Sequence, residues 1–251
     1  MSSATVISAS PPTALPGSGP FKPLGAEFAR YYGWLYFTAR TGAEGLAWAT
    51  EYRSHREILE LTNHALDMMR GGQLGKGWGQ LEDYRNAINS LVGIPNSMRA
   101  EMYRRYHAAA GYYYYCVEDY ELAHRAMCLA HEKTVEAIHE SRFLVMLAIR
   151  CQEYCVHRAR IARKHRRWSQ MHELIGLGWA MNTNQAPLCQ LPDGYTIFFS
   201  TLIPFFHSLE PLTEEELMAI HRWIDDSERD QIFDRFVRLL IRRAGAGLDW
   251  R

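Results

Sequence analysis

A recurring spacing of aromatic, small and apolar residues restricts the fold of this chain more than any other feature. The clearest copy places Tyr120, Ala123 and Met127 at successive steps of three and four residues. Two further copies have the same steps: Tyr84, Ala87 and Leu91, and Trp168, Met171 and Ile175. In a helix these steps keep all three residues on one face, and the middle residue limits how closely a neighbouring helix can approach. The chain is therefore expected to form helical units that repeat.

The middle copy belongs to a longer pattern, about residues 104 to 137, in which small Ala110 and Gly111 precede Tyr114. This pattern resembles the tetratricopeptide family, whose helix-turn-helix units recur at roughly 34 residues and stack into a solenoid. The resemblance is best over residues 79–181. It departs from the family at His107, where Trp is usual, and at Val135, where Pro is frequent. The aromatic residues are 36 residues apart from Tyr84 to Tyr120 and 48 apart from Tyr120 to Trp168, so the repeat is irregular.

The resemblance implies an all-α, tetratricopeptide-like α-solenoid of antiparallel helix pairs, closed by a C-terminal capping pair. Apolar residues at steps of three and four agree with this and predict the following helices: 24–40, 43–70, 79–92, 97–116, 119–139, 141–165, 168–181, 194–208, 213–225 and 228–243. The stretch from Gly71 to Gly79 is expected to break the helices, with Gly75-Lys-Gly77 as a flexible turn. The Ser- and Pro-rich residues 1–20 are predicted to form a disordered tail, and residues 21–251 a single helical-repeat domain.

The composition indicates which cellular compartment and which classes of partner are expected for this protein. The 28 basic and 28 acidic residues balance, so no global charge favours nucleic acid or an anionic membrane. The five cysteines are odd in number and lie mostly in predicted helices, which favours buried free thiols over disulfides. The chain begins with no secretory signal pattern, and no apolar run approaches the roughly 18 residues of a membrane span. We expect a cytoplasmic protein without a membrane segment.

In a tetratricopeptide-like stack, the first helix of each pair lines the concave face. On that face the spacing gathers six candidate ligand-binding residues: Arg105, Tyr112, Tyr115, Arg160, Arg163 and Lys164. Guanidinium groups offer paired planar donors, which suit a carboxylate, a phosphorylated residue or an acidic peptide. The sequence thus predicts an adaptor or regulatory module that binds an acidic segment of another protein. In the alternative interpretation, the tyrosines belong to the core and the arginines form a solvated face.

The same basic region raises nucleic acid as a partner. Residues 158–168 carry six formal positive charges without an acid, and phosphate backbones favour such a density. The chain is neutral as a whole, however, and contains no nucleic-acid fingerprint beside this run. We therefore expect a protein or peptide partner before a nucleic acid.

An all-α metal-dependent enzyme is the rival hypothesis. Glu-x-x-His spacings, which helical di-iron proteins use, occur at Glu121 with His124 and at Glu136 with His139. These two pairs lie on one predicted helix, roughly 22 Å apart, so they cannot hold one cluster together. A mixed site made of Glu121, His124, Glu153 and His157 stays open. Because histidines in a helix-rich chain produce such spacings by chance, we expect no cofactor, and the cysteine pair at 151 and 155 is interpreted as buried thiols.

Overall fold

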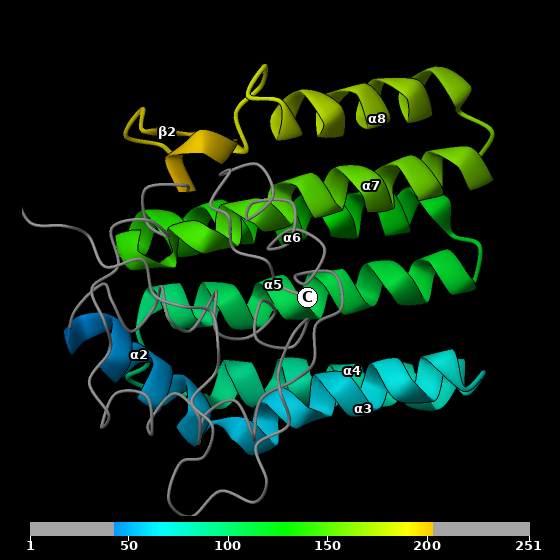
Figure 1. Cartoon of the computed structure of the whole chain (residues 1–251). Helices are drawn as coiled ribbons and strands as arrows, with labels where there is room; N and C mark the ends of the chain where they lie inside the picture. Colours follow the sequence, from blue (N-terminus) through cyan, green and yellow to red (C-terminus); the bar gives the residue numbers. More distant parts are fainter. Residues whose placement is uncertain (1–42, 203–251) are drawn as a thin grey trace, which may run out of the picture. The chain divides into compact units, whose positions relative to one another are not determined.

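The computed structural model describes residues 43–202, and these are mostly helical (Figure 1). The chain divides into two compact units, Thr50–Phe199 and a second one made of Met1–Ala49 with Ser200–Arg251. The all-α prediction is confirmed for the described residues. Within the same range, no helix combines the length and the apolar character needed to cross a membrane.

The helices of the unit Thr50–Phe199 follow one another as adjacent pairs. Their bounds are α3 Arg56–Arg70, α4 Leu74–Ser90, α5 Asn96–Cys116, α6 Tyr120–Glu140, α7 Ile149–Lys164 and α8 Trp168–Asn182. The most extensive packing joins α3 to α4, α5 to α6, and α7 to α8, with smaller contacts from α4 to α5 and from α6 to α7. Figure 1 shows these helices side by side in chain order. Pairing buries the apolar face that one helix alone would expose to solvent.

Three-residue turns of one kind connect the two helices of every pair. Their middle residues, Gly72, Glu118 and Arg166, all have positive φ angles, of 80°, 64° and 59°. In each turn the amide of the next residue donates to a carbonyl five positions back, at 2.8, 3.0 and 2.8 Å. This Schellman arrangement satisfies the last carbonyls of the first helix and starts the second helix at once. The turns are 46 and 48 residues apart, a longer spacing than the roughly 34 residues of tetratricopeptide units.

The glycine-rich segment is more helical than predicted. Only Gly71, Gly72 and Gln73 form the turn, and α4 already begins at Leu74, so the prediction of a flexible turn at 75–77 was wrong. A Cβ built at Gly77 would lie 2.7 Å from the carbonyl oxygen of Ala65 on α3. Gly77 therefore lets the two backbones approach closely, a tertiary role that outweighs its poor helix propensity.

The contact between α5 and α6 follows the predicted packing. Ala123 is fully buried, and a Cβ at Gly111 would lie 2.5 Å from the Cε of Met127. Ala123, Met127, Ala130, Tyr154 and Ile161 form one buried cluster shared by α6 and α7. The residue three positions after the aromatic is thus small because another helix lies against it.

A buried polar link joins the first helices of two neighbouring pairs. Arg104 on α5 donates to the carboxylate of Glu101 at 2.5 and 2.6 Å and to the hydroxyl of Tyr154 on α7 at 3.1 Å. That hydroxyl also lies 3.5 Å from Thr134 Oγ1 on α6. Burial raises the pKa of Tyr154, so its hydroxyl remains neutral, and the guanidinium charge is balanced by Glu101 alone. Buried charges of this kind require such complete pairing.

Helix boundaries were predicted well where a turn separates two amphipathic stretches and less well elsewhere. The helix predicted at 43–70 is broken at His55 into α2 Ala43–Ser54 and α3. The first part of the predicted helix 141–165 is the 3₁₀ helix η1 Arg142–Ala148. Residues 196–197, predicted as helical, pair with residues 189–190 as two short antiparallel strands, β2 Thr196–Ile197 and β1 Cys189–Gln190, so this prediction was wrong.

Several predictions concern residues that lie outside the described range. These are the tail at 1–20, the helix at 24–40, the part 203–208 of the helix at 194–208, and the capping pair at 213–225 and 228–243. The extent of a single domain over 21–251 likewise stays a prediction.

Replacing Ala123 by Trp should lower the free energy of unfolding by about 1–3 kcal/mol, because an indole has no room at this helix contact. Chemical denaturation of the purified protein measures the change. Gly79→Trp is the control, since a Cβ at Gly79 has no heavy atom within 4 Å. Equal effects of the two substitutions would contradict the close packing of α5, α6 and α7 around Ala123.

Candidate anion-binding site

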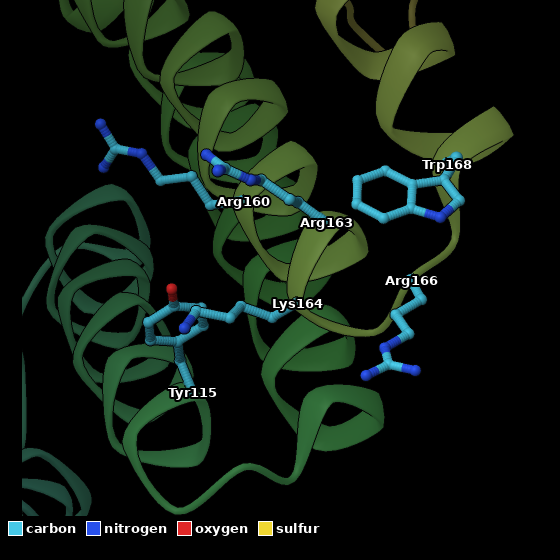
Figure 2. Close-up of a pocket in the computed structure, with 6 residues that line it drawn as sticks. All are labelled: Tyr115, Arg160, Arg163, Lys164, Arg166 and Trp168. Atoms are coloured by element: carbon cyan, nitrogen blue, oxygen red, sulfur yellow. The ribbon is translucent and has the colours of Figure 1, made fainter.

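A pocket of about 460 Å³ lies at the turn end of α7. It is lined by Tyr115 of α5, by Arg160, Arg163 and Lys164 of α7, by Arg166 of the following turn, and by Trp168 of α8. Figure 2 shows the side chains of Arg160, Arg163 and Lys164 leaving α7 in one direction, on the side of Tyr115. Arg166 and Trp168 lie beyond the last turn of the helix. We call these six residues the basic pocket.

Helix geometry explains why the three α7 cations of the basic pocket share a side. Positions 160, 163 and 164 are three and four residues apart, so they lie on one face. Ile161 and Ala162 between them are buried, with exposed fractions of 3% and 1%. Packing of these apolar residues fixes the rotation of α7 and so directs the cations toward solvent. The buried residues thereby determine where the charged ones point.

The basic pocket has an uncompensated positive charge. Arg160, Arg163, Lys164 and Arg166 are exposed, and within residues 43–202 none of them forms an ion pair with an acidic side chain. Their neighbour Arg167 behaves differently, because it forms an ion pair with Glu121 on α6. Four cations that line one pocket repel each other. Such an arrangement is relieved by a bound anion, which is the chemistry that the pocket offers.

Two histidines of α6, His124 and His131, add no positive charge around neutral pH. Desolvation, followed by the positive charge of Arg158, lowers the pKa of both His124 and His131 on α6. Both imidazoles are therefore neutral at pH 7. Anion binding at the basic pocket should weaken as the ionic strength rises.

Two aromatic residues flank the cations, and they differ in exposure. Tyr115 packs against the buried cluster of α6 and α7, with its ring centroid 6.1 Å from that of Tyr120. Trp168 is 54% exposed, which is unusual for so large an apolar side chain. Tyr115 thus forms a fixed wall, whereas the indole of Trp168 is available for contact with a ligand.

The structure brings together four of the six predicted ligand-binding residues. Tyr115, Arg160, Arg163 and Lys164 line the basic pocket, whereas Arg105 and Tyr112 do not. Arg105 donates to the hydroxyl of Tyr52 at 3.1 Å. Burial raises the pKa of Tyr112, with a hydrogen bond to Cys116 as a further cause and the charge of Arg70 as an opposing one.

Sequence reasoning missed two residues of the basic pocket, Arg166 and Trp168. Both were visible in the sequence, one in the basic run and the other as the aromatic residue of the third repeat copy. What places them at the pocket is the turn between α7 and α8, where Arg166 has a positive φ angle. A non-glycine residue in this conformation is not readily predicted from sequence.

The alternative metal ligands are not gathered into a site. Glu121 is paired with Arg167, and Arg150 donates to both carboxylate oxygens of Glu153 at 3.2 and 3.0 Å. Among the described residues, which include His124 and His157, no three His, Cys, Asp or Glu side chains are placed to hold a metal ion. The mixed site of Glu121, His124, Glu153 and His157 is therefore not formed.

The cysteines are free thiols, as predicted. Cys151, Cys155 and Cys189 are buried, and Cys116 and Cys128 are partly buried. Burial raises the pKa of Cys151 and Cys155, so these thiols stay protonated and unreactive near neutral pH.

Comparisons with protein-family models, with curated proteins and with solved structures found no match to this chain. Its function is therefore inferred from the side chains and their arrangement.

The substitution Arg166→Gly tests two effects of this residue separately: the effect of its left-handed backbone on stability, and the effect of its charge on anion binding. Relief of the left-handed backbone should contribute about 1–2 kcal/mol, and the greater freedom of glycine in the unfolded chain should offset about half of that. The free energy of unfolding should therefore stay equal or rise by up to about 1 kcal/mol, while binding of an anionic ligand weakens. Denaturant unfolding and fluorescence anisotropy measure the two quantities.

Glu118→Gly is the matched control, because Glu118 occupies the equivalent turn position but does not line the basic pocket. It should change stability in the same way and leave binding unaffected. Weakened binding in the Glu118 variant would show that the turn substitution itself, and not the lost Arg166 charge, is responsible.

Proposed function

We propose that this protein is an adaptor or regulatory module that binds an acidic segment of another protein in its basic pocket. The observation that carries the proposal is that Arg160, Arg163, Lys164 and Arg166 line one pocket, without an acidic partner among the described residues. Structural ion pairs normally neutralise such groups, as Glu121 does for Arg167. A ligand that supplies carboxylates or phosphate groups would complete the pocket.

The repeated hairpins support the module as a tetratricopeptide-like stack. Three helix pairs joined by the same Schellman turn repeat one structural unit, and each pair packs on the next. In such stacks the first helices of successive pairs form a shared surface for extended or helical ligands. The basic pocket takes Tyr115 from the first helix of one pair, and Arg160 and Arg163 from the first helix of the next, as this architecture would require.

Reversing the charge of the pocket should abolish binding without unfolding the protein. The double variant Arg160→Glu and Arg163→Glu keeps good helix formers at exposed positions, so the circular dichroism spectrum should not change. Affinity for a fluorescein-labelled peptide of consecutive glutamates should fall on the order of a hundredfold or more, because like charges then face each other. Fluorescence anisotropy at constant ionic strength measures the affinity.

The matched control is Lys76→Glu with Arg125→Glu, which makes the same change in net charge at exposed positions outside the pocket. It should bind the glutamate peptide as the parent does. Arg160→Lys with Arg163→Lys keeps the charge and should weaken binding only where paired donors matter. Equal binding by the parent and the double glutamate variant would refute the basic pocket as the ligand site.

Mass spectrometry of proteins captured from native lysate would then identify the natural partner. Proteins retained by the parent and by the Lys76/Arg125 control, but not by the Arg160/Arg163 glutamate variant, are the candidates. If the retained molecules were single-stranded RNA, and ribonuclease released every captured protein, the partner class would be nucleic acid instead.

A further inference from the structure

The last helix of the described stack, α8, has an exposed apolar stripe. Trp168, Ile175 and Trp179 are 54%, 54% and 66% exposed. They are seven and four residues apart, steps that return to one face at 3.6 residues per turn. The stripe therefore extends over about 16 Å of helix.

Another side of α8 already has its partner. Leu174, Gly178 and Met181 are buried, and Leu174 packs with Ala159 and Ala162 of α7. Burial of this side leaves the stripe facing solvent on the flank of the helix. Single exposed apolar residues are ordinary, but an aligned set with two tryptophans is typical of an interaction surface.

Trp168 belongs both to this stripe and to the basic pocket. The two features therefore meet at Trp168, so that the basic pocket lies at one end of the stripe, and Ile175 and Trp179 follow beyond the exposed His172. Resting on the proposed function, we infer that the ligand is an amphipathic helix of a partner protein, with acidic residues at one end and an apolar face beyond them. The acidic end binds in the basic pocket, and the apolar face covers Trp168, Ile175 and Trp179.

A helical ligand follows from the chemistry of the stripe. The exposed face of α8 offers side chains but no free backbone donors or acceptors, because a helix satisfies these groups internally. An extended peptide laid on the two tryptophans would bury its own amides and carbonyls without partners, at a substantial cost. A helix has no such requirement, and it can bring residues at steps of three and four onto a stripe of this length.

The distribution of charge distinguishes a protein ligand from an anionic membrane. A peripheral membrane site surrounds its apolar residues with cations. Here the cations of the basic pocket gather at the Trp168 end only, and the exposed side chain of Glu173 lies on the same helix as the stripe. The surface is thus directional, which suits a ligand whose acidic and apolar parts follow each other along one chain.

Three labelled synthetic peptides of about 18 residues, longer than the stripe, test the inference. The amphipathic peptide begins with consecutive glutamates and continues as an alanine-rich helix with leucines at steps of three and four. The acidic peptide replaces the leucines by glutamine, and the apolar peptide replaces the glutamates by glutamine. Fluorescence anisotropy against the full chain gives each affinity.

The stripe is tested with Ile175→Gln combined with Trp179→Gln, and Leu177→Gln is the matched control on another side of α8. We expect the parent to bind the amphipathic peptide on the order of tenfold more tightly than the acidic one. The stripe variant should lose that difference and keep its affinity for the acidic peptide. Leu177→Gln should preserve both affinities, and the apolar peptide should bind more weakly than the amphipathic one.

Failure of this inference can be told apart from failure of the basic pocket. If the acidic peptide binds and requires Arg160 and Arg163, but the stripe variant binds the amphipathic peptide as the parent does, the α8 inference is wrong and the pocket stands. Absence of any binding by the amphipathic peptide also overturns it. If the double variant Arg160→Glu and Arg163→Glu bound the amphipathic peptide with the affinity of the parent, the stripe and the pocket would not be one site.

Two further measurements would assign the stripe to another occupant and so overturn the inference. Co-sedimentation of the parent, but not of the stripe variant, with phosphatidylserine-containing vesicles would make it a membrane-binding surface. A dimer in sedimentation velocity that the stripe variant converts to a monomer would make it a contact between two copies of this chain.

Discussion

The close approach of helix backbones in the first two hairpins is the constraint on which the rest of the structure depends. Gly77 and Gly111 occupy positions where a Cβ would meet the neighbouring helix, and Ala123 is fully buried at the second contact. Because these two hairpins are closed this tightly, their three-residue turns have little choice of conformation. The third hairpin has the same kind of turn, and its left-handed residue is Arg166. The turn conformation therefore places a cation at the surface.

Contacts between pairs then give the basic pocket its two sides. Arg104 on α5 reaches Tyr154 on α7, and Tyr154 belongs to the buried cluster against which Tyr115 packs. This link sets the separation of the two first helices whose ends line the pocket. A guanidinium satisfied by Glu101 and Tyr154 inside the fold contrasts with the guanidinium groups of Arg160 and Arg163 outside it. An arginine that is paired with a carboxylate inside the fold thus stabilises the structure, whereas an arginine without such a pair at the surface is available for binding.

Amphipathic periodicity was sufficient to predict most of α5 to α8, because each has a buried stripe and ends at a compact turn. The same periodicity failed at Gly75 and Gly77, since low helix propensity was taken as a break although tertiary contact with α3 favours the helix there. It also failed at residues 196–197, where two-residue strands are too short to produce an alternating pattern. Spacing on one helix face gave Arg160, Arg163 and Lys164, which line the basic pocket with Tyr115, whereas Arg105 and Tyr112 do not line it.

The sequence by itself determined that the chain is helical, where its hairpins lie, and that a dense basic run ends the helix at Lys164. These properties are local, since they depend on residues a few positions apart. Only the tertiary structure decided which cations of the basic run form an ion pair with an acidic side chain. Glu121, far away in sequence, pairs with Arg167, whereas Arg160, Arg163, Lys164 and Arg166 form no such pair among the described residues. Likewise, only the packing of α7 against one side of α8 decided that Trp168, Ile175 and Trp179 face solvent. Ion pairing and burial depend on the distances between side chains that are far apart in the sequence. These distances follow only from the way the helices pack.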